Sequence, residues 1–353
     1  MRNKFARRTS SNSSTSSLAR SRSTQSAFIG GKFNDDDDDD DDDDDYYGCD
    51  DYRVPHNNGK DYDSARFSTA TANDDIGYRV ARRRRSSLVA GSLDDPTESS
   101  VYSSKGRLVF KIGSRGPEPG NFTWPRGVAA GMGAADREIV VADSSNHRVQ
   151  VFDRCGGFLR EFGTYGSAIG QFDCLAGLAI DRLNRNYIVT DRYNHRVQIF
   201  TMSGEFVRTF GENGRDIGKF NLPWGIACDM NGSIYVCDKE NHRVQVFDSD
   251  GKYLYKFGIG GSEPGQLQHP HYIATSAGKI AVTDTNNHRV QLFDLNGRLI
   301  KVIGKEGSQE GQFRFPRGVA LDEQGYLIIG DSGNNRLQIF NPEGIFVKVS
   351  RGS

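Results

Sequence analysis

Short runs of alternating apolar and polar residues fill about the last two-thirds of the chain, and one of these runs recurs. In residues 147–152, Val149 and Val151 alternate with polar neighbours, which predicts a half-buried β-strand. The ten-residue stretch around it, Asp-Ser-Ser-Asn-His-Arg-Val-Gln-Val-Phe, returns four times at intervals of 48, 47, 46 and 47 residues. This period indicates one structural unit stacked on itself. The copies begin at Asp143, Asp191, Asp238, Asp284 and Asp331.

The pattern within each unit predicts four short antiparallel strands, which we call a, b, c and d. In the first unit they are expected at residues 126–130, 138–143, 147–152 and 158–163, with turn residues between them. The d–a loop, which leads to the next unit, is long and glycine-marked, so the backbone can adopt positive φ there. Four strands at this period, with no helical periodicity, are typical of a β-propeller blade, whereas a β-sandwich would not keep so strict a period. The predicted fold class is therefore an all-β propeller.

Two kinds of repeated residue have a predictable structural role. Asp143 and Arg148 lie five residues apart across the b–c turn, as do Asp331 and Arg336, which predicts a hydrogen-bonded ion pair that uses the planar guanidinium in a bidentate way. One apolar residue follows the glycines of each d–a loop and is expected to fill the gap between neighbouring sheets. These residues are Phe122, Phe172, Phe220, Leu267 and Phe313.

The repeated pattern Pro-x-Gly-Val-Ala, followed by Val-Ala-Asp-x-x-Asn-His-Arg-Val-Gln-Val-Phe, resembles the NHL repeat. The resemblance covers residues 107–350 and is to the C-terminal domain of Brat-like and tripartite-motif (TRIM-NHL) proteins. It implies an NHL propeller over residues 105–350, behind a leader of residues 1–104. The five repeats are expected near residues 107–163, 164–211, 212–258, 259–304 and 305–350.

The number of predicted strands leaves one strand over. An isolated d-type strand at residues 107–113 precedes five full units. Similar NHL propellers usually close with six blades and share the last blade between both ends. We therefore expect a truncated six-blade ring, about 35 residues short because strands a to c of the sixth blade are missing. A tight five-blade ring with residues 108–112 at its edge is the alternative, since an open ring leaves unpaired edges.

The leader is expected to be disordered. Residues 9–26 are mostly Ser, Thr, Arg and Ala, and eleven consecutive aspartates at 35–45 repel one another. Residues 1–104 carry a net charge of −5 and the remaining residues +4, so this acidic segment is either a solvated spacer or a competitor of nucleic acid for the basic domain. The arginines at 82–85 form a candidate nuclear-import or phosphate-binding patch, and Ser87 beside them is a candidate phosphosite.

Sequence motifs for catalysis or metal binding are missing. There is no glycine-rich phosphate loop, no Ser/His/Asp set and no CxxC pair, and the five cysteines are interpreted as free thiols in a reducing compartment. Four histidines (His147, His195, His242 and His288) share one repeated slot, filled by Asn335 in the fifth copy, so they are interpreted as architecture. We expect no enzyme activity, cofactor, metal or small-molecule substrate. No apolar run reaches the roughly 18 residues of a membrane span, and a cytoplasmic or nuclear location is expected.

The residues that break the repeat are the candidates for function, because the architecture does not require them. In propellers the d–a loops and b–c turns open on one face, and in this chain they bring cations together with aromatic residues. That combination suits phosphate contact and base stacking in single-stranded RNA, although rim residues can also be merely solvated. The candidate RNA- or partner-binding residues are Arg126, Arg192, Tyr193, Trp224, Lys239, His271, Tyr272, Arg314 and Arg317.

Three functions fit this pattern. The first is an RNA-binding propeller in post-transcriptional regulation, since similar proteins bind uridine-rich or hairpin RNA on this face. The second is a protein-recruitment propeller of a TRIM-type ubiquitin ligase system that acts in ubiquitination and proteasomal degradation, although the scattered cysteines supply no RING or B-box spacing here. The third is a propeller enzyme similar to the amidating lyases, for which no non-repeated His and Asp set is found.

Overall fold

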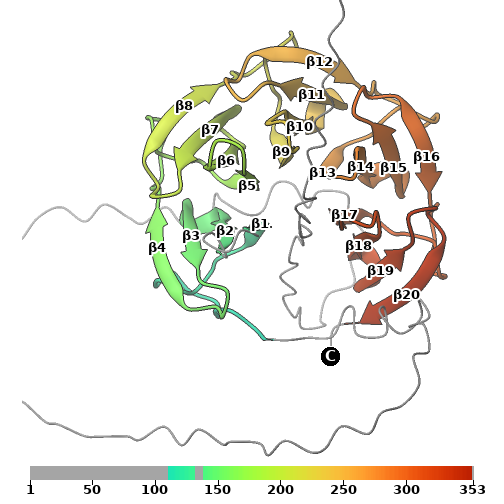
Figure 1. Cartoon of the computed structure of the whole chain (residues 1–353), viewed down its shortest axis with the longest axis horizontal. Helices are drawn as coiled ribbons and strands as arrows, with labels where there is room; N and C mark the ends of the chain where they lie inside the picture. The colour runs from blue at the N-terminus through green and yellow to red at the C-terminus, as the bar shows by residue number, and fades with distance from the viewer. Residues whose placement is uncertain (1–109, 132–137, 352–353) are drawn as a thin grey trace, which may run out of the picture. The chain divides into compact units, whose positions relative to one another are not determined.

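The computed structural model describes residues 110–131 and 138–351, which form twenty β-strands and four short 3-10 helices. The strands make five four-stranded antiparallel sheets, which stand as blades around a common axis (Figure 1). This confirms the predicted all-β propeller with five full blades. The predictions for the leader, including the aspartate run and Ser87, lie outside the described residues. Over the described part of the chain, no helix is long and apolar enough to cross a membrane.

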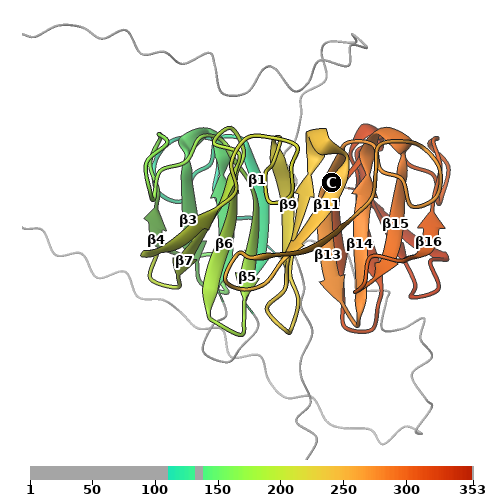
Figure 2. The same ribbon diagram turned by 90° about the horizontal axis from the view of Figure 1, so that it is seen from above.

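Each blade runs from an inner strand at the axis to an outer strand at the rim, and the strands extend between the two faces of the ring (Figures 1 and 2). The first two blades contain β1 (Pro125–Ala130), β2 (Ile139–Asp143), β3 (Arg148–Phe152) and β4 (Phe158–Phe162), then β5 (Leu175–Asp181), β6 (Asn186–Asp191), β7 (Arg196–Thr201) and β8 (Phe206–Phe210). The third contains β9 (Pro223–Cys228), β10 (Ile234–Asp238), β11 (Arg243–Phe247) and β12 (Tyr253–Phe257). The last two contain β13 (Pro270–Ser276), β14 (Lys279–Asp284), β15 (Arg289–Asp294) and β16 (Leu299–Ile303), then β17 (Pro316–Leu321), β18 (Leu327–Asp331), β19 (Arg336–Phe340) and β20 (Phe346–Arg351). The short helices η1 (Ser144–Asn146), η2 (Lys239–Asn241), η3 (Thr285–Asn287) and η4 (Ser332–Asn334) form four of the b–c turns.

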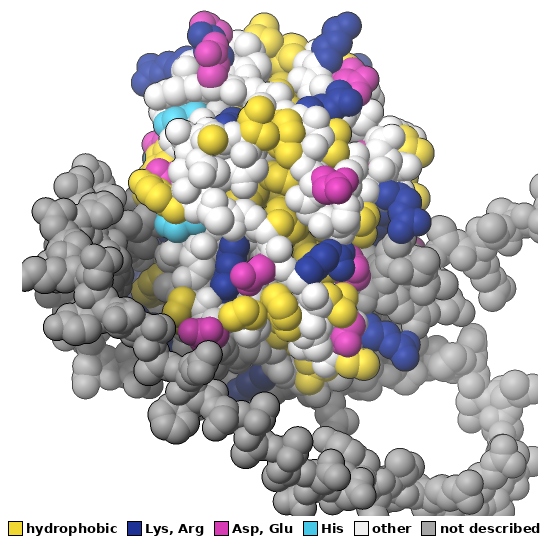
Figure 3. Space-filling model, turned by 90° about the vertical axis from the view of Figure 1, so that its left-hand side faces the viewer, with side chains coloured by type: hydrophobic (Ala, Val, Ile, Leu, Met, Phe, Trp, Pro, Cys, Tyr) yellow, Lys and Arg dark blue, Asp and Glu magenta, His cyan; other side chains and the backbone are white. Residues whose placement is uncertain are grey.

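The position of a strand within its blade decides which of its side chains are buried. The middle strands of the inner blades lie between neighbouring sheets, so both of their faces are covered, and β10 of the third blade is accordingly a continuous buried run of Ile, Tyr, Val and Cys. The outer strands have one solvent face and alternate instead, as in β8. Leu159 and Val207 are exposed at the second position of β4 and β8. Hydrophobic side chains accordingly appear among charged ones on this side of the ring (Figure 3).

The apolar residue of the d–a loop fills the space between two blades, as predicted, in four of the five copies: Phe172, Phe220, Leu267 and Phe313. Among the described residues, Phe122 packs against the first blade and Ile112. Phe172 is fully buried and packs with Val149 of the first blade and Phe200 of the second. Its ring centroid lies 5.5 Å from that of Phe200. The ring also covers Gly163, where a Cβ would lie 2.5 Å from it, so the loop needs a glycine at this point. Full burial of a phenylalanine contributes about 1.5–3 kcal/mol to folding.

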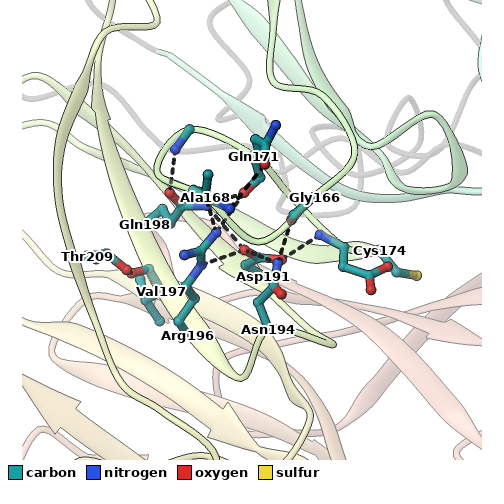
Figure 4. A network of polar contacts seen from close by, with 12 residues as sticks. Gly166, Ala168, Gln171, Cys174, Asp191, Asn194, Arg196, Val197, Gln198 and Thr209 are labelled. Atoms are coloured by element: carbon teal, nitrogen blue, oxygen red, sulfur yellow. Dashed lines mark hydrogen bonds and ion pairs between the residues drawn. The ribbon is translucent and has the colours of Figure 1, made fainter.

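A buried aspartate at the end of strand b joins each blade to the loop that precedes it (Figure 4). In the second blade, Asp191 accepts hydrogen bonds from Arg196 Nε at 2.7 Å and from Gln198 Nε2 at 3.1 Å. Its other oxygen, Oδ1, accepts the backbone N–H of Asp173 at 2.8 Å, and Asn194 Nδ2 donates to both oxygens. The same set of contacts recurs at Asp238, Asp284 and Asp331. At Asp143 it recurs with one difference, since Asn146 donates to Oδ2 alone.

The arginine of this network also binds the loop. While Arg196 Nε donates to Asp191, its Nη2 donates to the carbonyl oxygens of Ala168 and Gln171 at 2.8 and 2.9 Å. The predicted ion pair is confirmed in all five blades. The predicted bidentate geometry is wrong, because the d–a loop passes over the guanidinium and brings its carbonyl groups within reach. The planar fork therefore links a carboxylate to a loop.

The repeated histidine joins each blade to the next one. His195 ends the b–c turn of the second blade in the left-handed conformation, with φ of 52°, and its Nδ1 accepts the backbone N–H of Leu222 at 3.2 Å. An imidazole that accepts through Nδ1 carries its proton on Nε2 when neutral. The equivalent bonds join His147 to Cys174, His242 to His269 and His288 to Phe315. These contacts support the interpretation of the four histidines as architecture.

The start of the ring departs from the prediction of an isolated d-type strand at 107–113. Residues 110–113 contain no strand, and 107–109 lie outside the described residues. Ile112 nevertheless occupies the place of the last residue of an outer strand. In the second blade, the c–d turn glycine Gly204 lies against Phe162, the last residue of β4, which is 2.8 Å from a Cβ built on that glycine. In the first blade, the equivalent glycine Gly156 lies against Ile112, which is 3.0 Å from a Cβ built there. A strand needs a hydrogen-bonded neighbour, and the described residues offer none here. The first and fifth blades face each other across an opening in the ring (Figure 1).

We predict that Asp191→Asn destabilises the propeller by about 3–5 kcal/mol, because it removes the fully buried carboxylate that pairs with the largely buried Arg196. Urea unfolding followed by circular dichroism measures the change. The matched control is Asp250→Asn, which breaks the exposed pair with Arg208 and should cost below about 1 kcal/mol. Equal effects of the two substitutions would contradict the assigned role of Asp191.

We predict that acid weakens the contacts between blades. Burial lowers the pKa of His147, His195 and His242, partly opposed by nearby carboxylates such as Asp173 and Asp238. Because these folded-state pKa values lie below the ordinary 6.5, the stabilisation is complete above pH 6.5 and is lost as the pH falls through the folded-state values.

The melting temperature should therefore fall between pH 7.5 and pH 5.5. His195→Asn keeps a residue that tolerates the left-handed conformation, and it should lower the melting temperature at pH 7.5 while reducing the drop on acidification. A variant with the full wild-type drop would rule out His195 as one of the titrating groups.

Candidate functional site

The second residue of each inner strand faces the axis at the mouth formed by the d–a loops and b–c turns. Arg126 takes this position in β1, Trp224 in β9, His271 in β13 and Arg317 in β17. Four different blades thus bring one residue each to the same end of the axis. The b–c turns add Arg192, Tyr193 and Lys239. Together with Tyr272, we call these eight residues the Trp224 cluster.

The indole of Trp224 is the centre of this cluster. Its side chain is only 2% exposed, and three cations lie over its ring. The Cζ atoms of Arg126 and Arg192 are 4.7 and 4.4 Å from the ring centroid, and Lys239 Nζ is 5.2 Å from it. His271 meets the indole edge-on at 4.8 Å. Cation–π attraction of this kind contributes about 0.5–2 kcal/mol per contact and holds the charged groups in place.

Two threonines on the b strands set the spacing of the inner strands. The hydroxyl of Thr190 accepts the N–H of Gly177 at 2.6 Å and donates to the carbonyl of Trp224 at 2.5 Å. In the same way, the hydroxyl of Thr283 accepts the N–H of Tyr272 and donates to the carbonyl of Arg317, each at 2.8 Å. A Cβ on Gly177 would lie 2.3 Å from the carbonyl oxygen of Trp224. Only glycine therefore permits the close approach that aims the Trp224 side chain at the axis.

Tyr272 crosses the axis and links opposite blades. Its hydroxyl, from β13 of the fourth blade, donates to the carbonyl of Arg126 in the first blade at 2.9 Å. Burial raises the pKa of Tyr272, while the charges of Arg126 and Arg317 oppose that shift. The phenol therefore remains protonated and can keep donating at neutral pH. This bond ties the first blade to the fourth.

The described charges of the cluster are mainly positive. Arg192 and Lys239 are 2% and 1% exposed, which is unusual for cations. Glu240 provides a negative charge, because its carboxylate lies 3.1 Å from Lys239 Nζ and 3.2 Å from His269 Nδ1. Its hydrogen bond to His269 and the charge of Lys239 lower the pKa of Glu240 to about 2, although burial opposes the shift. Among the described residues of the cluster and its neighbour Glu240, four cations, Arg126, Arg192, Lys239 and Arg317, thus stand against one carboxylate, which pairs with Lys239. An excess of positive charge of this kind attracts anions.

The structure places most of the predicted site residues in this cluster. Tyr193 joins it through Arg192, whose Cζ lies 4.6 Å from the phenol ring. Arg314 lies elsewhere, because its backbone N–H binds Asp331 Oδ1 at 2.8 Å and its side chain packs against Gly333 of the last b–c turn. It is exposed on the rim of the same face. Its position before Pro316 directs it to its own blade, whereas residues after that proline face the axis.

Two features of this face escaped the sequence analysis. The pairing of Glu240 with His269 joins a b–c turn to the next d–a loop, and no repeated pattern contains it. A pocket over the third blade, described below, combines residues from two loops, the turn η2 and two strands. In both cases the available signal was a departure from the repeat, by Glu240 and His269 for the pair and by Arg215 and Lys256 for the pocket. Over residues 110–131 and 138–351, no three His, Cys, Asp or Glu side chains come together as a metal-binding group.

Comparison with known proteins agrees with this geometry. The NHL repeat family matches residues 122–152, 172–200, 220–247, 267–293 and 313–340, that is, all five blades. RING finger protein nhl-1 of Caenorhabditis elegans is 48% identical over 172 residues, which are 49% of this chain and 17% of that protein. Protein brain tumor of Drosophila melanogaster is 40% identical over 76 residues, 22% of this chain and 7% of that protein. Mouse tripartite motif-containing protein 3 is 46% identical over 69 residues, 17% of this chain and 9% of that protein.

Solved structures support the fold alone. The nidogen/laminin complex has a TM-score of 0.52 at 19% identity, covering 65% of this chain and 80% of that one. Streptogramin B lyase has a TM-score of 0.50 at 16% identity, covering 68% and 72%. Because one of these proteins forms a complex and the other is a lyase by name, the fold does not decide between binding and catalysis.

The fold and the five matched repeats define an NHL-repeat β-propeller. Its relatives among the curated proteins make it, more particularly, a propeller of the TRIM-NHL type. The matching part of the chain spans less than a fifth of the length of each of these three relatives.

Proposed function

We propose that this propeller is a non-catalytic interaction module that binds single-stranded or hairpin RNA at the Trp224 cluster, in post-transcriptional regulation. The observation that carries this proposal is the set of three cations, Arg126, Arg192 and Lys239, held around one indole at the axial mouth. RNA presents a dense row of phosphates, and cations fixed in advance bind them with little loss of side-chain entropy.

The aromatic residues divide into two roles. Trp224 is buried, so it orients the cations and does not offer a face to a base. Tyr193 is only half-buried, and Trp124, in the d–a loop before β1, is 51% exposed, so both have ring surface available on this face. Stacking of a base on such a ring contributes about 1–3 kcal/mol and tolerates any sequence. Phosphate contacts at the centre and stacking beside it together suit a flexible strand.

Protein recruitment, as in a TRIM-type ubiquitin ligase system, is the second candidate function. The observation that favours it is a group of exposed apolar side chains on the d–a loops. Tyr165, Ile169, Ile217 and Ile259 are between 59% and 67% exposed. Exposed apolar residues on one face are typical of protein interfaces. RING finger protein nhl-1 carries a RING finger by its name, so a substrate-binding role of the propeller is a consistent alternative.

The test is a binding assay with a fluorescein-labelled twelve-nucleotide oligouridine and a salt series. In the full chain, Arg126→Glu with Arg317→Glu should weaken binding at least 10-fold and lower the slope of log Kd against log salt by about 1 or more, because phosphate contacts are lost. The control pair, Lys252→Glu with Arg298→Glu, changes the charge equally at exposed residues in c–d turns on the opposite face. Equal binding by both double variants would contradict RNA binding at the cluster and favour protein recruitment.

A further inference from the structure

A pocket of about 420 Å³ lies over the third blade, on the same face as the Trp224 cluster but nearer the rim. Its walls come from the d–a loop before β9, the turn η2, the strands β11 and β12, and the loop that follows β12. Its size is in the range of small-ligand sites. Three cationic side chains and one carboxylate line it: Arg215, Arg243, Lys256 and Glu240.

Two of these cations depart from the repeat at the same blade. At the position of Arg215, the other d–a loops have Pro117, Ser167, Ser262 and Ser308. At the position of Lys256, the other outer strands have Glu161, Thr209, Val302 and Val349. The propeller therefore folds without a cation at either position. Both appear in the third blade, where they flank Arg243, and the fold gives no reason for that coincidence.

The first blade shows what the architecture does at this position. There Arg148, the counterpart of Arg243, places Nη1 at 2.9 Å from Glu161, so a carboxylate neutralises the outer end of its guanidinium. In the third blade Lys256 replaces that carboxylate and adds a positive charge beside Arg243. The Nε group of Arg243 donates to Asp238 at 2.7 Å, as the equivalent arginines do in the other blades. An anion from outside would restore the charge balance that Glu161 provides in the first blade.

The remaining wall residues suit an anion with an apolar portion. Glu240 does not cancel the excess charge, because Lys239 and His269 already pair with it. The Nδ1 of His242 accepts the N–H of His269, so the neutral ring keeps a proton on Nε2. Ile259 is 63% exposed at the pocket wall, where the other loops have Ser114, Thr164, Glu212 and Lys305. A phosphate beside a planar base has this combination of charge and apolar surface.

We propose that this pocket binds a nucleotide phosphate and, given the RNA-binding function proposed above, a backbone phosphate of the strand that the Trp224 cluster holds. The two sites are adjoining, because η2 belongs to both. Lys239 points to Trp224 on the axial side, and the next residue, Glu240, lines the pocket. A strand that runs outward from the axis over this turn would cross both sites in succession.

The substitution that tests this is Lys256→Glu, because it recreates at the third blade the pair that Arg148 and Glu161 make in the first, and so is compatible with the fold. Uridine 5′-monophosphate titrated into the full ¹⁵N-labelled chain should shift the backbone amides of Gly258 and Gly260 saturably. In Lys256→Glu this binding should weaken at least 10-fold. Lys252→Glu, which makes the same charge change at an exposed c–d turn, should bind as the wild type does.

The oligouridine assay separates this inference from the proposed function. Lys256→Glu should weaken oligouridine binding about 5- to 10-fold and lower the salt slope by about 0.7, the value for one phosphate of a single strand. If the wild type binds no oligouridine but still binds the monophosphate through Lys256, the RNA proposal fails and the nucleotide-phosphate pocket stands. Wild-type monophosphate binding by Lys256→Glu would overturn the pocket. The assignment of the pocket to a nucleotide phosphate would also be overturned if a phosphoserine peptide bound through Lys256 at least 10-fold tighter than the monophosphate.

Discussion

The buried aspartate at the end of each b strand is the interaction on which the propeller depends. A carboxylate without solvent must be satisfied by donors, and here an arginine, an asparagine, a glutamine and a backbone amide of the preceding loop supply them, as at Asp191. Breaking a buried pair costs several kcal/mol more than the intact pair contributes. The four residue types Asp, Asn, Arg and Gln must therefore occur together, and this requirement explains why the polar stretch recurs in every blade.

This dependence explains how much of the structure could be predicted from the sequence. Strand order, the Asp143–Arg148 pair and the interblade position of Phe172 follow from period, spacing and burial, and all were confirmed. The second binding partner of each arginine could not be predicted, because loop carbonyl groups have no sequence signature. The segment 110–113 was predicted as strand from its residues, but strand formation requires a hydrogen-bonded neighbour.

The candidate site was predicted less completely, for a geometric reason. Residues that follow the repeated proline face the axis, so Arg126, Trp224, His271 and Arg317 were brought together by topology alone. Arg314 precedes that proline and faces its own blade. The burial of Trp224 beneath three cations depends on side-chain packing between blades, which the sequence pattern does not reveal. An exposed indole would offer its face to a ligand, whereas the buried one holds the cations in place.

The contacts between the aspartates and the d–a loops also bear on how the face meets a ligand. Loop amides such as those of Gly170 and Asp173 donate to buried acceptors, Gln198 Oε1 and Asp191 Oδ1, much as amides in a sheet do. We therefore expect these amides to exchange with solvent as slowly as those of the core strands. A surface of this kind is rigid before the ligand arrives. Association then requires little reorganisation of the protein, and discrimination between ligands rests on the fixed spacing of its charges.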